Sequence, residues 1–355
     1  MSVAETAGRS SPAGMGRRRR IPPGSPAGPG YRRLLTWLAV VAVLGGFVAW
    51  SARRHPAEPT KPMTVEGRPE VSEITGRRFR VACFNIRRGK GNDGVRDLNR
   101  TADAIRRIKP DVVGLFEVDG RPWGTNRNQA ADLADQLGMA AVFAPTERRF
   151  WHDHFGNALL SRVRFGSVNR IPLPCTQYRK FRNALLTRYV VGGRTVNFLA
   201  AHLDRVKDRE QQLRDVFALF HSLKAPAVLV GDLNTMDNDP LLHELLARGD
   251  SVNALLACRG DWPQRRVDWI LARGVNVLNS GCVDDGVSDH PLMWADLELP
   301  EDPPMGNTQI SRQALAPGSS EFDSKPGASA RRLMTSQRHR SRIPTTRIAT
   351  RRTDR

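Results

Sequence analysis

The sequence has little cysteine, few aromatic residues and only one long hydrophobic run. Its 355 residues include 4 Cys and 3 Tyr, and aromatic residues make up 6%. The cysteines form no CxxC pair and no cluster with histidine, which argues against a zinc site and a disulfide-rich miniprotein. One hydrophobic run excludes a protein that crosses a membrane many times. Apolar residues still make up 40% of the chain, too many for a chain that is disordered throughout.

Acidic residues are also outnumbered, with 36 Asp and Glu against 55 Lys and Arg, for a net charge of +19. Most of this excess lies at the two ends, because residues 1–77 carry a net charge of +7 and residues 300–355 one of +6. The Arg-rich stretch 331–355 could contact nucleic acid, but a solvated tail is the plainer interpretation. The basic balance therefore says little about what the middle of the chain binds.

The one long hydrophobic run lies near the N-terminus. Residues 34–50 are 17 uncharged residues, and Ser51 and Ala52 extend the run to 19. A helix of that length just spans the hydrocarbon core of a bilayer. We expect a single-pass anchor at 34–52, with a cleaved signal peptide or a buried helix as alternatives. Seven arginines precede the run and four basic residues follow it within 53–68. This bias favours a cytoplasmic N-terminus and an extracytoplasmic catalytic domain.

The rest of the chain divides by composition. Residues 1–33 and 300–355 are predicted to be disordered, and residues 53–77 to be a linker, because Pro, Gly, Ser and charge dominate them. Residues 78–299 are long enough for one well-buried domain, which we expect to be monomeric. Cys83 lies in an apolar run and is expected in the core, whereas Cys258 and Cys282 would be the candidate disulfide pair if the domain is exported.

Within 78–299, short apolar runs alternate with amphipathic stretches. The runs at 80–86, 111–117, 195–201, 227–231 and 267–271 predict buried strands. Helices are predicted at 97–109, 129–137 and 208–223, and Asp239-Pro240 predicts the start of a further helix. The sequence therefore predicts an α/β domain in which helices cover sheets.

Polar side chains recur where these strands stop. Each alone fits a turn, but together they provide carboxylates, amides and two histidines. Oxygen ligands without cysteine suit Mg²⁺ or Mn²⁺, and histidines suit proton transfer near neutral pH. The pattern predicts metal-assisted hydrolysis of a phosphate ester. It consists of Asn85, Glu117, His202-Leu-Asp204, Asp232-Leu-Asn234, Asp268 and Ser288-Asp-His290.

The ordered series of motifs resembles the endonuclease/exonuclease/phosphatase superfamily, which has the deoxyribonuclease I-like fold. The resemblance covers about 80–299 and implies a four-layer α/β sandwich, with two mixed sheets face to face and helices outside. Its motifs are Phe84-Asn-Ile86, Pro110-Asp-Val-Val-Gly-Leu-Phe-Glu-Val-Asp119, Gly156-Asn-Ala-Leu-Leu-Ser161, His202-Leu-Asp204, Gly231-Asp-Leu-Asn234, Val267-Asp-Trp-Ile-Leu271 and Ser288-Asp-His290.

The resemblance also implies roles for individual residues. Mg²⁺ or Mn²⁺ would be bound by Glu117 and Asn85, with Asp289 also reaching the metal. The catalytic set would be His202, Asp232, Asn234, Asp268 and His290, where Asp232 orients or deprotonates water and Asp268 holds His290. Asn157, Arg182 and Arg87 would support the site or bind substrate.

Two features leave the substrate open. Phe116 stands where the family usually has Gln, and the motifs of the abasic-site endonuclease and inositol polyphosphate 5-phosphatase branches are absent. The loop at 148–154 contains Phe150 and Trp151, which could stack on a base or insert into lipid. We expect a nuclease or other phosphodiesterase, with a hydrolase of phospholipid headgroups or small esters as the alternative and an inactive binding module as the third. A nuclease should present a basic trough, and a lipid enzyme should present apolar rim loops on the anchor side.

Overall fold

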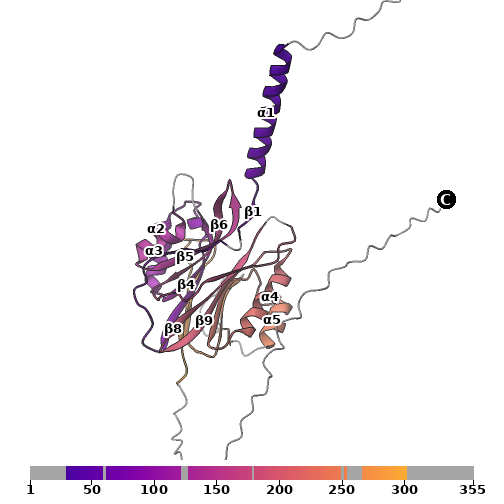
Figure 1. Cartoon of the computed structure of the whole chain (residues 1–355). Coiled ribbons are helices and arrows are strands. Elements are labelled where there is room, and N and C mark those ends of the chain that lie inside the picture. Colours follow the sequence, from indigo (N-terminus) through magenta and orange to yellow (C-terminus); the bar gives the residue numbers. More distant parts are fainter. Residues whose placement is uncertain are drawn as a thin grey trace, which may run out of the picture. The chain divides into compact units, whose positions relative to one another are not determined.

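The computed structural model describes residues 29–58, 61–120, 127–177, 180–248, 252–253 and 266–301 (Figure 1). The predicted disordered segments fall outside these ranges, apart from residues 29–33 and 300–301. Cys258 also lies outside the described residues, so its pairing with Cys282 stays a prediction.

The first sheet is mixed and has eight strands in the order β1-β5-β6-β4-β3-β14-β13, with β2 also paired to β5. Strands β3 and β4 are parallel, and the other pairings are antiparallel. The strands are β1 (His55–Pro56), β2 (Val65–Gly67), β3 (Arg78–Asn85), β4 (Val112–Asp119), β5 (Ala140–Arg149), β6 (His152–Ser161), β13 (Asn276–Val283) and β14 (Leu292–Glu298).

The second sheet has six strands in the order β11-β12-β10-β9-β8-β7, and only β9 and β10 run parallel. The strands are β7 (Asn169–Pro172), β8 (Asn183–Val191), β9 (Arg194–His202), β10 (Ala227–Asp232), β11 (Val252–Asn253) and β12 (Asp268–Arg273).

The helices begin and end at the signals that the sequence carries. They are α2 (Leu98–Ile108), α3 (Gln129–Leu137), α4 (Arg209–Ser222) and α5 (Pro240–Ala247), with a short 3₁₀ turn η1 at Arg87–Gly89. Asp239 caps α5 by accepting hydrogen bonds from the backbone of Leu241 and Leu242, and Pro240 stands at its first position, as predicted. Gly138 ends α3 in the left-handed conformation, with φ of 65°.

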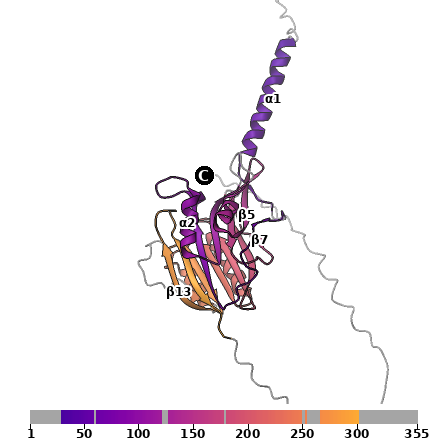
Figure 2. The same ribbon diagram turned by 90° about the vertical axis from the view of Figure 1, so that its left-hand side faces the viewer.

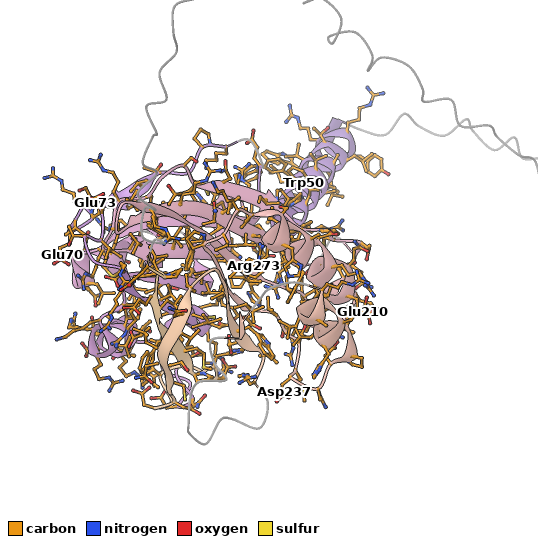
Figure 3. All side chains as sticks on the ribbon, turned by 90° about the horizontal axis from the view of Figure 1, so that it is seen from below. Trp50, Glu70, Glu73, Glu210, Asp237 and Arg273 are labelled. Atoms are coloured by element: carbon orange, nitrogen blue, oxygen red, sulfur yellow. The ribbon has the colours of Figure 1, made fainter. Side chains whose placement is uncertain are left out.

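Three hydrophobic layers hold these elements together. Phe116, Phe198 and Ile270 belong to the core between the two sheets. Ile105 of α2 and Leu133 of α3 pack on the outer face of the first sheet, and α4 packs in the same way on the second. The four-layer sandwich expected from the resemblance is confirmed, and Figures 1 and 2 show the helices outside the sheets. Glu210 of α4 and, from the other side of the molecule, Glu70 and Glu73 mark its periphery in Figure 3.

Strands β3, β4, β9 and β10 all end at one edge of the sandwich, which we call the site edge. The evidence is direct contact across the two sheets, because Asn85 at the end of β3 hydrogen-bonds to Asp232 at the end of β10. The polar residues that follow the predicted strands therefore gather on one side of the fold.

The predicted hydrophobic segment is helical. Helix α1 spans Pro29–Ser51, and within the described residues it is the one helix that is long and apolar enough to cross a membrane, over Gly30–Ser51. A signal sequence would pass the same test, so α1 is a candidate span. The stretch 53–77, expected as a linker, contributes β1 and β2 to the edge of the first sheet. The sequence did not predict β1, because proline is tolerated in edge strands but not in central ones, so Pro56 argued against a strand.

Candidate functional site

Asp232 is the centre of the polar cluster. Strand register places it opposite His202 of β9 on one side and Asp268 of β12 on the other, so the sheet itself aligns the three side chains. The Asn85 amide donates to Asp232 Oδ2 at 2.9 Å, and the backbone N–H of Asn234 donates to Oδ1 at 3.1 Å. Asp232 is buried, with 1% of its surface exposed.

The surroundings of Asp232 disfavour its charge. Burial raises its pKa most, the neighbouring carboxylate of Asp268 raises it further, and His290 and the Asn85 hydrogen bond oppose both effects. The net result is a pKa of about 6. Such a carboxylate is ionised at neutral pH yet is a better proton acceptor than an exposed one.

His290 and Asp268 form a pair beside Asp232. Asp268 Oδ2 accepts a hydrogen bond from His290 Nδ1 at 2.8 Å, and His290 Nε2 lies 3.9 Å from Asp232 Oδ2. Burial lowers the pKa of His290, but the hydrogen bond to Asp268 and the charges of three carboxylates outweigh it, raising the pKa to about 9. The other oxygen of Asp268 is buried and has no hydrogen-bond partner among the described residues.

His202 has the opposite environment. It is 1% exposed, and Arg182 Nη1 lies 3.1 Å from its Nδ1. Since a guanidinium can only donate, Nδ1 must accept and the ring proton lies on Nε2, which is 3.3 Å from Asp232 Oδ2. Burial and the charge of Arg182 hold the pKa of His202 well below its usual value. The ring of Phe116, which stands in place of the usual Gln, packs edge-on against His202 at 5.9 Å between centroids.

The predicted metal ligands lie on the first-sheet side of the cluster. Phe116 pairs with Asn85 in the β3–β4 ladder, so Glu117 comes directly after the paired residue. A bulge in β4 lies at this position, and Glu117 has a φ of 55°. Ser288 Oγ donates to the Asn85 carbonyl at 2.7 Å and brings Asp289 to the same side. Two carboxylates and an amide with no thiolate are a donor set that fits Mg²⁺ or Mn²⁺. Asp232, Asp268 and His290 also present ligand atoms within 4.8 Å of one another, a second arrangement that could hold a cation.

Three predicted residues make other contacts. Asn157 is buried and donates to the side chain and backbone of Asn183, so it joins β6 to the residue beside Arg182. The Asn234 amide donates to the Leu203 carbonyl at 2.9 Å. Arg87 lies 3.2 Å from the carboxylate of Asp289.

Sequence reasoning missed a network beside Glu117. Asp119 accepts from both Arg88 and Arg96, and Arg88 also contacts His154 Nε2 at 3.0 Å. Arg87 was expected to support the site or bind substrate, and it faces the carboxylate of Asp289, while Arg88 and Arg96 face that of Asp119. The only sequence signal was the position of Asp119 two residues after Glu117, and spacing alone does not reveal which arginine it meets.

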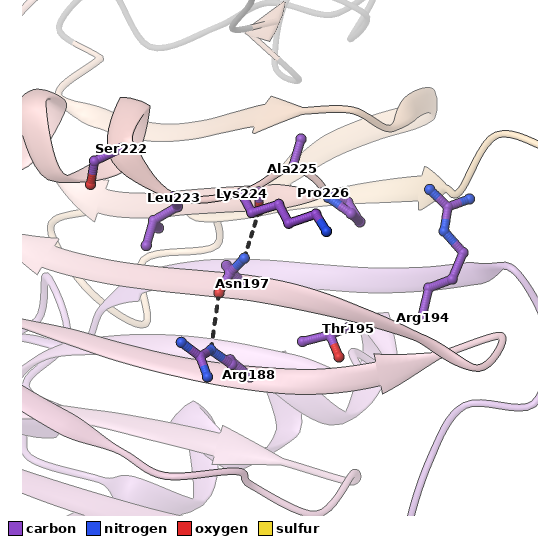
Figure 4. Close-up of a pocket in the computed structure, with 9 residues that line it drawn as sticks. All are labelled: Arg188, Arg194, Thr195, Asn197, Ser222, Leu223, Lys224, Ala225 and Pro226. Atoms are coloured by element: carbon purple, nitrogen blue, oxygen red, sulfur yellow. Dashed lines mark hydrogen bonds between the residues drawn. The ribbon is translucent and has the colours of Figure 1, made fainter. Parts of the chain in front are cut away.

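A pocket of about 690 Å³ lies elsewhere, at the opposite edge of the second sheet (Figure 4). Its lining comes from β8, the start of β9, and the end of α4 with the segment that follows it, and includes Arg188, Arg194 and Lys224 around Asn197. No predicted site residue lines it, so this pocket is separate from the site edge.

Comparisons with known proteins agree with this geometry. The model of the endonuclease/exonuclease/phosphatase family matches residues 82–290. A solved endonuclease/exonuclease/phosphatase from Beutenbergia cavernae is similar at 28% identity and a TM-score of 0.53, covering 63% of this chain and 72% of its own. A family protein from Bacteroides vulgatus shares the fold at 19% identity and a TM-score of 0.50, covering 63% and 99%. Among curated proteins no match is found. The chain therefore belongs to the endonuclease/exonuclease/phosphatase family, whose members are phosphoester hydrolases.

Proposed function

We propose that this protein is a divalent-metal-dependent phosphodiesterase in which water attacks phosphorus at the site edge. The observation that carries the proposal is the buried Asp232, which lies between one histidine with a raised pKa and one with a lowered pKa. Groups whose surroundings push their pKa values apart can hold and accept protons at the same pH. That division of labour is what hydrolysis of an ester requires.

The metal would be Mg²⁺ or Mn²⁺, held by Glu117, Asn85 and Asp289. When bound, such an ion neutralises charge on the phosphoryl oxygens. The family is generally divalent-metal dependent, and the hard oxygen donors of these three residues support the choice of ion. Arg87 competes for Asp289 at 3.2 Å, so its side chain would turn toward the substrate phosphate when the ion takes that carboxylate.

The protein's own groups would divide the proton chemistry. Asp232 orients the attacking water and accepts its proton, because its raised pKa makes it a competent base. His290, protonated at neutral pH and held through Nδ1 by Asp268, donates a proton to the leaving oxygen. Neutral His202, held by Arg182, directs Nε2–H toward Asp232 Oδ2 and so holds the position of that carboxylate. The remaining N–H of the Asn234 side chain would donate to a phosphoryl oxygen.

We also propose that α1 is an uncleaved anchor with a cytoplasmic N-terminus. The excess of arginine before the hydrophobic run supports the orientation. Contacts between the last turn of α1 and the domain, described below, support retention, because cleavage would remove them. The mass of the chain purified from membranes tests this: an intact N-terminal segment is expected, and a chain that begins after Ser51 would contradict it.

The experiment for the activity uses the full chain, since β1 and β2 belong to the sheet. It is assayed with Mg²⁺ or Mn²⁺ on bis-p-nitrophenyl phosphate, plasmid DNA, RNA and sphingomyelin vesicles, beside Asp232→Ala and His290→Ala. Hydrolysis of at least one diester that both variants lose is the expected result. No hydrolysis of any of them, or hydrolysis that survives in both variants, would overturn the proposal.

A further inference from the structure

We propose that the loops of the site edge form a bilayer-docking surface, fixed against the membrane by α1 and the β5–β6 hairpin, so that the substrate is a phosphoester in a phospholipid headgroup. This deepens the proposed function and rests on it.

The first observation is that α1 joins the sheet almost without a spacer. Three residues separate Ser51 from His55, where β1 begins and pairs with Arg148 of β5. The backbone N–H of Phe150 donates to the Ser51 carbonyl at 2.8 Å, and Arg149 Nε donates to the Ala52 carbonyl at 2.8 Å. The end of the helix is therefore bonded to the tip of the β5–β6 hairpin.

Aromatic rings reinforce this junction. Trp151 at the hairpin tip lies 5.1 Å from Phe47 and 6.5 Å from Trp50, both in the last two turns of α1 (Trp50 is labelled in Figure 3). Trp50 in turn lies 5.0 Å from His55. Trp151 is still 53% exposed. Tryptophan prefers the membrane–water interface, so a ring cluster at the end of a candidate span is the expected composition of that zone.

The second observation is that this hairpin rises from the site edge. Asp119, two residues after Glu117, pairs with Phe155 of β6. A Cβ on Gly120 would lie 1.9 Å from the Asp153 carbonyl oxygen, so this position admits only glycine and the strands are held in close contact there. From Phe155 the strand continues four residues to Trp151, roughly 13 Å at the rise of a β-strand. The end of α1 is thus on the same side of the domain as the site, roughly 20 Å from Glu117.

The third observation concerns apolar side chains that no other part of the described domain covers. Besides Trp151, the site-edge loops expose Val95 at 56%, Val206 at 74% and Met236 at 37%. Each follows a strand that ends at this edge, and exposed Arg205 and Lys207 flank Val206. Apolar side chains exposed on several separate loops, one of them flanked by cations, are typical of a surface that seats on a membrane with anionic headgroups.

The arrangement also disfavours a nucleic-acid trough. Arg87, Arg88 and Arg96 near the site face Asp289 or Asp119. A polyanion would have to displace these carboxylates, whereas a bilayer needs only the exposed loop tips. The alternative that the sequence left open, an apolar rim on the anchor side, is the one these contacts favour.

Orientation is tested first, because it does not depend on activity. The full chain with Cys175, Cys258 and Cys282 replaced by Ser is placed in nanodiscs of phosphatidylcholine and phosphatidylglycerol with an acceptor dye on a headgroup. A donor dye is attached through Val206→Cys at the site edge or Thr195→Cys at the opposite edge. Stronger energy transfer from position 206 is expected. Equal transfer, or stronger transfer from position 195, would overturn the proposal.

Substrate class is tested with a matched pair of variants. Val206→Glu should lower headgroup hydrolysis in the same nanodiscs about tenfold, the loss expected when one valine is no longer buried in the interface. Leu278→Glu, which alters an exposed apolar residue far from the site edge, should change nothing. Both should hydrolyse bis-p-nitrophenyl phosphate as the unaltered chain does. Failure on that soluble diester would contradict the proposed function itself. Two outcomes would overturn the docking proposal alone while bis-p-nitrophenyl phosphate is hydrolysed normally. One is hydrolysis of DNA or RNA but of no phospholipid, and the other is an equal effect of Val206→Glu and Leu278→Glu on headgroup hydrolysis.

Discussion

Replacing Asp268 by Asn removes a negative charge beside His290 while keeping the shape of the side chain. Asp268 is 1% exposed, and its Oδ2 lies 2.8 Å from His290 Nδ1. Because water does not screen this pair, the charge of Asp268 favours the protonated ring directly. The Asn oxygen can still accept from Nδ1, so the orientation of the ring is retained and the change isolates the electrostatic contribution.

The size of the effect follows from the type of bond. A hydrogen bond to a charged group contributes about 1.5–3 kcal/mol, against about 1 kcal/mol for a neutral one. Losing this difference lowers the pKa of His290 from about 9 and moves the alkaline limb of kcat to lower pH by roughly 0.4–1.5 pH units, since about 1.4 kcal/mol corresponds to one unit. KM should change little, because Asp268 is not expected to contact substrate.

The assay is hydrolysis of bis-p-nitrophenyl phosphate with saturating Mg²⁺. Asp296→Asn is the control, since Asp296 is a carboxylate of β14 that accepts hydrogen bonds from Arg80 of β3, away from the site. Melting temperatures of both variants separate a change in chemistry from a loss of folded protein. When kcat is measured as a function of pH, an alkaline limb for Asp268→Asn at the same pH as in the unaltered chain would refute the role assigned to the pair.

Three further predictions follow from the site. Glu117→Gln should weaken Mg²⁺ activation at least about tenfold by removing a charged oxygen ligand; an unchanged activation curve would place the metal elsewhere. The pH profile of kcat should be bell-shaped, because Asp232 must lose its proton as pH rises through about 6 and His290 keeps its proton until about 9; a single limb between pH 5 and 10 would contradict the assignment. Arg182→Met should raise the pKa of His202, since the charge of Arg182 helps to lower it. NMR titration of the His202 ring measures this, and an unchanged pKa would contradict the prediction.

Much of the fold could be predicted because its signals are local. The apolar run at 227–231 and the Asp239-Pro240 cap each specify a conformation from neighbouring residues alone, and both elements are present. The edge strands β1 and β2 were not predicted, because two or three residues with a proline carry no periodic pattern. Their place depends on pairing with β5, far along the chain.

The site divides in the same way. Strand ends identified Asp232, His202 and Asp268 as candidates, but their alignment depends on the register of three strands, which no local pattern encodes. The Arg182–His202 contact and the Asp119 network depend on which loops meet at the edge. Sequence therefore identified the chemical groups, while the opposite pKa shifts of the two histidines followed only from their packing.

The most direct test of the central claim compares the full chain with Asp232→Asn on bis-p-nitrophenyl phosphate, with Mg²⁺ present and then removed by EDTA. The account predicts hydrolysis that stops with EDTA, returns with added Mg²⁺ and falls by about 10²–10⁴-fold in the variant, the usual contribution of a general base. Hydrolysis that persists in EDTA, or that Asp232→Asn leaves unchanged, would contradict it.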